Sequence, residues 1–392
     1  MPGHAIAETL TTFAAAATPP AGGRMALADV PETDWRRLIE TAIESNGFYD
    51  PGFAVNAAKF ARGGHGGEAL TAREGERLIG LMPVVSALRA YRLPIPAFVA
   101  TVPYSVYGAP LLAKGHAERA AEGLLDAAAK AGAQLIVLPM LDLDGPAMAA
   151  FTKVLARRGQ VPLIHREHER AALAVPEDAE TYLRTGMGAK KLKELRRQRH
   201  RLDEEGAVAF TLAATPEAVA GAIDRFLELE ARGWKGQRGT GLGQSEGDAR
   251  FAREAALALA RAGTFEVLEL TLDGKALASG LVIRQGDTAL FFKIAYDEAF
   301  SRFSPGVQLT VELTRRLADD PAIAYADSTA LPGHPMIDHV WRERRRVGDV
   351  LVPTRTGAAG LVLARLVIAR DRLREQAKSV VHALRHYREK RK

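Results

Sequence analysis

The chain contains 392 residues, of which 47% are hydrophobic and 26% are charged, and this composition predicts a globular protein of two domains. It has no cysteine, which excludes disulfides, thiolate metal sites and a cysteine nucleophile, and no pair of histidines flanks a glutamate as in zinc hydrolases. The net charge of +6 is concentrated at the end of the chain, because residues 365–392 carry ten basic and three acidic residues.

The first part of the chain alternates between helical and strand patterns. Residues 1–23 are expected to form a flexible leader, because they lack the basic region of a signal peptide and contain Glu8. Residues 24–180 predict an α/β unit. Its helices are expected at Trp35–Ser45, Pro51–Ala61, Ala117–Ala131 and Pro146–Arg158, and its strands at Ala69–Arg73, Arg77–Ser86, Phe98–Pro103, Gln134–Pro139 and Val161–His165.

A basic segment, residues 181–206, follows this unit and predicts a linking helix. Seven of the twelve residues 190–201 are Lys or Arg, while Leu192, Leu195 and Leu202 lie along one narrow edge at helical spacing. One interpretation is a solvated bridging helix. The other is a surface that contacts phosphate or tRNA beside an active site, and the sequence favours neither.

Residues 207–356 repeat the order of elements of the first unit. Strands are expected at Ala207–Ala213, Thr264–Leu272, Lys275–Gln285, Thr288–Ala295, Ile323–Asp327 and Val347–Pro353, and helices at Pro216–Arg232, Gly247–Ala262, Ser304–Ala318 and His334–Arg345. The turns Asp273-Gly274 and Gly286-Asp287 are strong hairpin signals. We therefore predict two copies of one α/β unit in tandem.

The tail, residues 357–392, predicts an amphipathic helix. Its apolar positions have roughly helical spacing and are Leu366, Leu373, Val380, Val381, Leu384 and Tyr387. We expect it to pack on the protein with its basic face in water; contact with a membrane surface or an acidic polymer is the alternative. The apolar run around it is interrupted by Arg365, so no membrane span is expected.

The stretch RFSPGVQL at residues 302–309 joins a strand to a helix through a turn suited to an anion. Pro305 fits the first helical turn, Gly306 permits close approach to the backbone, and Arg302 adds a guanidinium suited to phosphate. Free N–H groups at the start of a helix bind anions. The competing interpretation is a helix that Ser304 merely caps.

Five sequence stretches, taken in order, carry a family resemblance: KKLKELRRQRHRLDEEG, FLELEARGWKGQRGTGL, FKIAYDEAFSRFSPGVQL, YADSTA and HVWRERR. Together they resemble the GNAT N-acyltransferases. The second half resembles the CelD-like acetyltransferase domain, which is related to the FemABX peptidyltransferases with two GNAT units. The resemblance implies that the fourth strand and the following helix of the second unit bind the pantetheine and pyrophosphate of acyl-CoA, at Arg302, Ser304, Pro305, Gly306, Val307 and Gln308. The first half, with YSVYGAPLLAKGHAERA at the corresponding point, is expected to have lost this site.

Candidate catalytic residues follow from their places in this fold. Asp327 ends a buried strand and is expected to orient the acceptor and accept its ammonium proton, unless it only caps the next turn. Tyr296 could protonate the leaving thiolate, or be an edge aromatic. Lys293 could bind a carboxylate or phosphate, or extend its charge to solvent. Expected acceptor-binding residues are Trp234, Lys235, Asp297 and Ser328, the first two in a Gly-rich loop.

These expectations define an N-acyltransferase that moves an acyl group directly from acyl-CoA to an amine. From the resemblance alone, the acceptor could be an amino sugar of envelope or exopolysaccharide metabolism, and the enzyme would be cytoplasmic. The enzyme alternative is a FemABX-type aminoacyltransferase that uses aminoacyl-tRNA, which would make nucleic acid a partner. A third hypothesis is a non-catalytic protein that binds an anionic polymer through the basic helix and tail.

Overall fold

The computed structural model describes residues 20–389 except 65, 234–235, 237–238 and 240, and it omits the side chains of 375 and 377–389. The first half contains β1 (Ala21–Ala26), α1 (Glu32–Glu40), α2 (Pro51–Phe60), β2 (Glu68–Glu74), β3 (Arg77–Ser86), α3 (Ala87–Tyr91), β4 (Ala97–Val99), β5 (Leu111–Leu112), α4 (Ala117–Lys130), β6 (Leu135–Asp142), α5 (Pro146–Arg157) and β7 (Leu163–Ala174). Two helices follow, α6 (Ala179–Met187) and α7 (Ala189–Asp203). The rest comprises β8 (Val208–Ala213), α8 (Pro216–Arg232), α10 (Glu246–Arg261), β9 (Phe265–Leu272), β10 (Lys275–Gln285), β11 (Thr288–Tyr296), α11 (Pro305–Ala318), β12 (Tyr325–Asp327), β13 (Glu343–Pro353) and α12 (Ala358–Glu389), with short 3₁₀ turns such as η4 (Glu298–Phe303).

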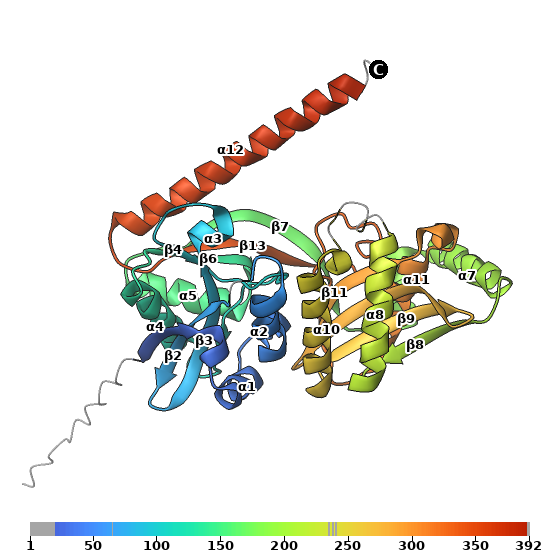
Figure 1. Ribbon diagram of the computed structural model, residues 1–392, viewed down its shortest axis with the longest axis horizontal. Coiled ribbons are helices and arrows are strands. Elements are labelled where there is room, and N and C mark those ends of the chain that lie inside the picture. The colour runs from blue at the N-terminus through green and yellow to red at the C-terminus, as the bar shows by residue number, and fades with distance from the viewer. Residues whose placement is uncertain (1–19, 65, 234–235, 237–238, 240, 390–392) are drawn as a thin grey trace, which may run out of the picture.

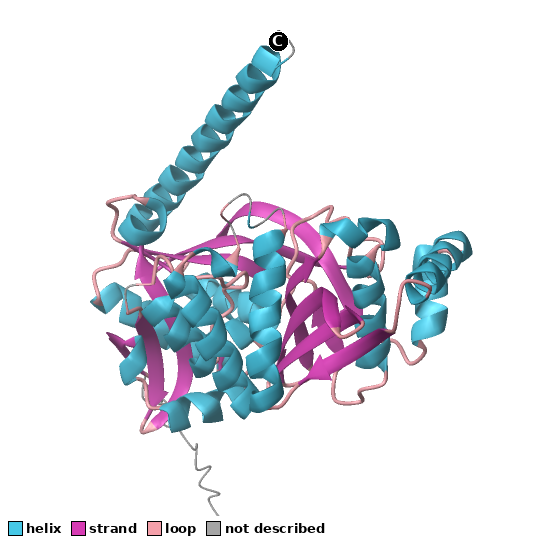
Figure 2. Ribbon diagram, turned by 45° about the vertical axis from the view of Figure 1, so that its right-hand side comes forward, coloured by secondary structure: helices cyan, strands magenta, loops and turns pink. Residues whose placement is uncertain are grey.

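The strands form one continuous mixed sheet of 13 strands in the order β1-β2-β3-β4-β6-β13-β7-β12-β11-β10-β9-β8, with β5 beside β3 (Figures 1 and 2). The prediction of two tandem α/β units is confirmed by this repeated order. The last strand of the chain, β13, lies between β6 and β7 of the first half, and the end of β7 pairs with β12 of the second. The two halves therefore share their central strands and cannot separate without breaking backbone pairing.

Helices cover both faces of the second half's strands. In β10, Leu281 and Ile283 face the core that includes α8 and α10, whereas Val282 faces the core that includes α11. This alternation is the two-residue period of a strand buried on both sides. The first of these cores continues into the first half, where α2 packs against α10 (Figure 1).

Aromatic rings join the two halves at this contact. Phe53 lies 5.2 Å from Phe48, 5.2 Å from Phe251 and 5.6 Å from Phe292 between ring centroids, each in an edge-to-face arrangement. Such pairs contribute beyond the area they bury. The ring of Phe292 thus fixes β11 against the first half at the point where the candidate site begins.

Several sequence predictions were wrong in position. The helix expected at His334–Arg345 is a series of turns followed by β13, which already begins at Glu343, because Arg345 points inward to buried carboxylates and not along a helix face. Strand β7 runs to Ala174, well past the predicted end, since its charged part pairs with β13. Residues 21–23, which were expected to belong to a flexible leader, form the start of β1, which pairs with β2. The sequence patterns also missed α3 and α6.

The C-terminal helix forms as predicted but packs differently. Ala364 and Val367 are buried against the first half, whereas Leu366 and Leu373, expected on the packed face, are 53% and 66% exposed. Beyond this contact α12 extends away from the body (Figures 1 and 2). Over the part of the chain that is described, no helix combines the length and the apolar character that crossing a bilayer requires.

Candidate active site

The parallel strands β11 and β12 pair only from Thr288 to Leu290 and from Tyr325 to Asp327, and beyond these residues a cleft lies between them. A β-bulge lies at the same level, because Phe292 has no counterpart in the register of β10. A bulge interrupts the backbone ladder and redirects side chains. Consequently Phe292, Lys293 and Ile294 all line the cleft, whereas successive side chains of a regular strand point to opposite faces.

The cleft has a volume of about 360 Å³ and a mainly apolar lining. Its second wall is the segment after β12, where the Thr329 hydroxyl donates to the carbonyl oxygen of Phe291 at 2.7 Å and so bridges the two strands. Ser328 also lines the cleft, and its hydroxyl accepts from the N–H of Ala330 at 3.2 Å. The first half contributes Tyr104 and Val106 to the same cavity.

A smaller cavity of about 270 Å³ adjoins the cleft. Glu230 and Gly233 of the α8 end, Tyr296 at the end of β11, and Glu298 of η4 line it. The two cavities share Ile294, His334 and Met336 as lining residues. The segment that follows β12 therefore divides one continuous channel into an apolar and a more acidic chamber.

The N-terminus of α11 opens toward this channel and has no side-chain cap. Ser304 adopts a left-handed conformation, with φ of 51°, and its side chain caps no N–H group, so the interpretation as a capping residue was wrong. A Cβ atom on Gly306 would overlap the sulfur of Met336, and its next neighbours would be Ile294 and Tyr296 at 3.6 Å. The Met336 side chain thus covers the turn at Gly306, where the sequence predicts that an anionic ligand binds.

The other residues expected to bind the donor surround this turn. Pro305 and Gln308 are buried, and the Gln308 side-chain amide donates to the carbonyl oxygen of Phe303 at 2.7 Å. Val307 packs on the α11 core. Arg302 is exposed and pairs with Glu205 at 2.9 Å. Among the residues expected to bind the donor, its guanidinium is the cation that a phosphate could reach from the surface.

The side chain of Lys293 lies inside the channel. Its Nζ atom lies 3.6 Å from Oε1 of buried Glu230 and 5.7 Å from the ring centre of Tyr104, so the expectation that it reaches solvent is wrong. The Tyr104 ring stacks on Phe251, with centroids 5.4 Å apart. Burial, together with Asp248, raises the pKa of Tyr104 to about 12 despite the opposing effect of Arg62, which keeps the phenol protonated at neutral pH.

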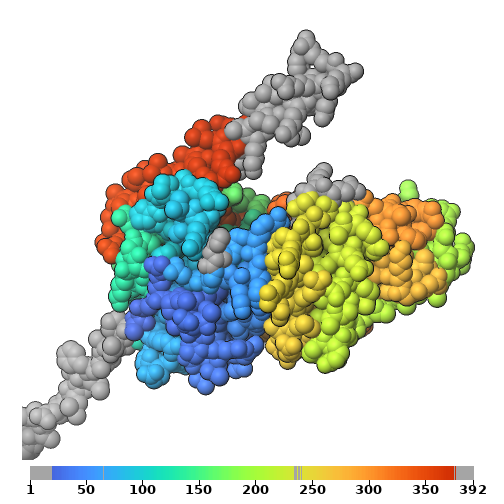
Figure 3. Space-filling model, viewed as in Figure 1, coloured from blue at the N-terminus to red at the C-terminus, as the bar shows by residue number. Residues whose placement is uncertain are grey.

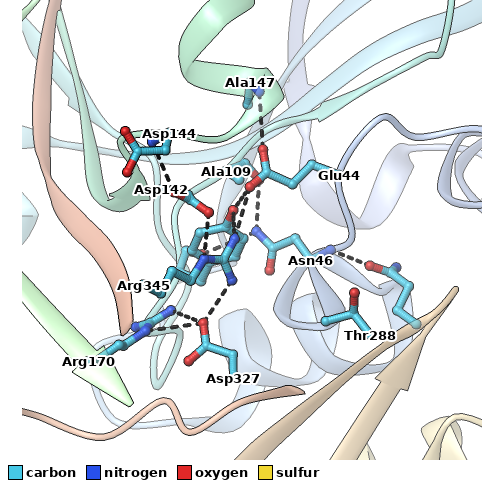
Figure 4. A network of polar contacts seen from close by, with 12 residues as sticks. Glu44, Asn46, Ala109, Asp142, Asp144, Ala147, Arg170, Thr288, Asp327 and Arg345 are labelled. Atoms are coloured by element: carbon cyan, nitrogen blue, oxygen red, sulfur yellow. Dashed lines mark hydrogen bonds and ion pairs between the residues drawn. The ribbon is translucent and has the colours of Figure 1, made fainter. Parts of the chain in front are cut away.

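Asp327 directly precedes the cleft residue Ser328 and is fully buried in an ion-pair network (Figure 4). Its Oδ2 atom is 2.6 Å from Arg170 and 2.8 Å from Arg345, and its Oδ1 atom accepts the N–H of Thr329 at 2.8 Å. Burial alone would raise the pKa of Asp327, but the two guanidiniums outweigh it and hold the pKa below its usual value. The prediction that Asp327 is a general base is therefore corrected, because its carboxylate is saturated and difficult to protonate.

The same network reaches the opposite end of β11 and β12. Arg345 also pairs with Asp142 at 2.8 Å and Glu44 at 3.0 Å, and Tyr107 donates its hydroxyl to Glu44 (Figure 4). Together with Arg170 and Asp327, these groups come from six separate segments of both halves. Glu44, Asp142 and Arg345 border a third, wider cavity of about 1310 Å³, lined mostly by polar residues. No sequence pattern predicts this network, because its members are 18 to 301 residues away from Arg345 along the chain.

Glu44 should make the stability of the protein depend on pH. Burial raises its pKa from 4.5 to about 7, although Arg345 opposes the change. The folded state then holds this proton more tightly than the unfolded state, so the free energy of unfolding should fall as the pH rises from about 4.5 to about 7, by up to about 3 kcal/mol. Thermal or urea unfolding across this range should show the fall in the native chain and a smaller one in Glu44→Gln. Equal pH profiles for the two proteins would contradict it.

The corresponding place in the first half is occupied by the chain itself. The N-terminus of α4 faces the Glu74 carboxylate, which pairs with His116 at 2.8 Å and with Arg119. Beyond the paired ends of β4 and β6, Gly108 lies so close to Pro139 that a Cβ atom would overlap its carbonyl oxygen. Both observations agree with the expectation that the first unit has no donor site.

Of the remaining sequence candidates, Asp297 does not line the channel. Asp297 accepts the N–H of Ala299 at 3.0 Å and so caps η4. Trp234 and Lys235 fall outside the described residues. The basic helix α7 packs through Leu192 and Leu202. Six of its seven basic residues in the range 190–201 are exposed.

Comparison with known proteins assigns most of the second half to a family domain. Residues 189–330 match the family model described as an acetyltransferase (GNAT) domain. The chain carries a GNAT acyltransferase domain. Its matched range contains β8 to β12 and the whole α11 turn, and it makes the protein an acyltransferase.

Solved structures extend the likeness to the whole chain. FemX superimposes with a TM-score of 0.56 at 10% identity, covering 88% of this chain and 99% of that one. The C-terminal domain of a putative lysylphosphatidylglycerol synthetase from Agrobacterium fabrum superimposes with a TM-score of 0.52 at 13% identity, covering 86% of this chain and 95% of that one. L-PGS from Bacillus licheniformis superimposes with a TM-score of 0.50 at 13% identity, covering 86% of this chain and 96% of that one. At these identities the likeness concerns the fold, that of two GNAT-like units. No protein of curated function matched the sequence.

Proposed function

We propose that the chain transfers an acyl group from acyl-CoA directly to an amine, in the channel between β11 and β12. The observation that carries the proposal is the uncapped N-terminus of α11 at the edge of an apolar cleft. Unpaired N–H groups and the positive end of a helix favour the pyrophosphate of the donor. The apolar cleft suits its pantetheine arm, and the bulge at Phe292 frees backbone near the position where the thioester carbonyl would be polarised.

The acidic chamber is proposed to receive the amine. Glu298 lines it beside Tyr296 and replaces Asp327 as the proposed proton acceptor, while Tyr296 would return a proton to the leaving thiolate. Ser328 lines the adjoining apolar cleft and is proposed to contact the acceptor from there. Lys293 pairs with Glu230 and is proposed to place its ammonium group between the donor and the acceptor. An amino sugar fits this chamber by its hydroxyl and ammonium groups, and it is the acceptor class proposed for the first assays.

The donor is expected to compete with Met336 for the turn at Gly306. Met336→Ala should bind acetyl-CoA at least as tightly as the native chain in calorimetry, because the sulfur no longer covers the turn. In that background, Gly306→Val should weaken binding at least about tenfold, since the added side chain fills the space over the turn that the donor would occupy. Unchanged affinity in the folded double variant would remove the turn from the donor site.

The number of donor sites tests the role of the first half. Because Glu74 and the chain at Gly108 fill the corresponding places, titration should give one acetyl-CoA per chain. Binding of two would show that the first unit also keeps a donor site.

Aminoacyl-tRNA is the second candidate donor, and the exposed basic surface of α7 favours it. That helix lies beside η4, where Glu205 pairs with Arg302 close to the α11 turn. Several phosphate contacts would make affinity fall by orders of magnitude between about 50 and 200 mM salt. A transfer assay with aminoacyl-tRNA and with acetyl-CoA, each at both salt concentrations, distinguishes the two donors. A non-catalytic role in polymer binding is not supported by the GNAT domain.

A further inference from the structure

The C-terminal helix α12 presents an apolar stripe on the side that faces away from the protein. Val362, Leu366 and Leu373 are separated by four and seven residues, which places them on one side of a helix, and they are 52%, 53% and 66% exposed. Few leucines of the described surface are so exposed. A helix that only packed on the body would bury these residues, so the stripe has another use.

The opposite side of α12 is fixed to the first half. Ala364 and Val367 are buried in a small core with strands β4, β6 and β13. One turn further, buried Asp371 pairs with Arg166 at 3.0 Å. These contacts determine the rotation of the helix, and so they direct the stripe outward. In the space-filling view the described side chains of α12 lie along the edge of the first half (Figure 3).

Basic residues flank the stripe. Arg365, Arg372 and Arg374 are exposed on either side of it. Residues 365–392 carry ten basic against three acidic residues, and the sequence repeats the apolar spacing at Val380, Leu384 and Tyr387. The charge argues against a second copy of the same helix, because two such helices would bring like charges together along their whole length. It favours an anionic surface.

We propose that α12 is an interfacial helix that binds the protein to a bilayer containing anionic lipid. The stripe would enter the boundary between head groups and acyl chains, while the arginines on both sides contact the lipid phosphates. The buried side of the helix would hold both halves of the protein next to the membrane surface. This proposal is independent of the donor and acceptor proposed above, because it rests on α12 alone.

Sedimentation of the full chain with vesicles tests the proposal. Binding is expected to vesicles of phosphatidylcholine mixed with phosphatidylglycerol and not to phosphatidylcholine alone, and it should weaken as salt is raised. The double variant Leu366→Glu and Leu373→Glu should lose at least about tenfold in vesicle affinity, because two apolar side chains leave the interface. The variant Arg372→Glu and Arg374→Glu should also bind less.

The matched control is Val161→Glu, which places a carboxylate on an exposed apolar residue elsewhere on the surface. It should bind vesicles as the native chain does. No binding to anionic vesicles, or an equal loss in the control, would overturn the proposal. A dimer in light scattering that the leucine variant abolishes would assign the stripe to a second copy. Retention on an RNA or acidic-polymer column that the leucine variant leaves unchanged, without vesicle binding, would assign the tail to a polymer.

Discussion

Replacing Asp327 by Asn should destabilise the protein by about 3–5 kcal/mol, an effect larger than any it has on the chemical step. The variant keeps the size of the side chain and one oxygen for the N–H of Thr329. It leaves Arg170 and Arg345, which are 2% and 8% exposed, with one fewer carboxylate between them. Removing one partner of a buried ion pair is costly because the other charge stays buried. Chemical unfolding at neutral pH measures this difference directly.

Asp144→Asn is a suitable control, since Asp144 pairs with Arg346 at 2.9 Å in a mostly exposed position. Exposed pairs contribute little, so this variant should change stability by less than about 1 kcal/mol. If Asp327→Asn unfolds like the native protein yet loses its rate, the carboxylate takes part in the chemistry, as the sequence predicted.

The network around Arg345 also explains how one sheet holds two units. Each half contributes charged groups to it, and β13 and β7 cross between the halves at the same level. The ion pairs thus lie where the chain passes from one unit to the other. They support Thr329, which bridges the walls of the cleft, so the shape of the candidate site depends on contacts made by residues of the first half.

Local signals in the sequence predicted most elements but not the contacts between distant ones. The Asp273-Gly274 turn and the apolar pattern on both sides placed the β9–β10 hairpin correctly, because turn chemistry and strand period are properties of neighbouring residues. The Ser-Pro-Gly turn likewise marked the start of α11. Asp327 was correctly placed at the end of a buried strand, but its role was misjudged, since its partners at Arg170 and Arg345 cannot be recognised from nearby sequence.

The same limit explains the other errors around the site. Met336 lies in the segment that was predicted as a helix over His334–Arg345 and that forms turns instead, so nothing in the sequence indicated that it covers Gly306. Tyr104 comes from the first half, and only the shared sheet brings it to Lys293. In α12 the apolar spacing was recognised, yet periodicity alone does not say whether an apolar side faces the protein or the solvent.

Replacing Glu298 by Gln should reduce turnover by roughly the 10²–10⁴ that is typical of a lost general base. Glu298 is exposed and lines the acidic chamber, so an incoming ammonium can reach it from solvent and transfer a proton to it before attack. Glutamine keeps the shape but accepts no proton at neutral pH. Donor affinity should change little, because the α11 turn binds the donor independently. The loss should appear in kcat and diminish at high pH, where the amine is already neutral.

Asp297→Asn is the matched control, one residue away. Asp297 caps η4 through an oxygen that asparagine retains, so this variant should keep both its rate and its stability. The two substitutions remove the same charge from adjacent positions, and a general change of electrostatic potential would affect them equally. A large loss in Asp297→Asn with a normal Glu298→Gln would move the base to Asp297. Equal losses in both would mean that the negative charge of this turn attracts the amine and that neither carboxylate takes its proton.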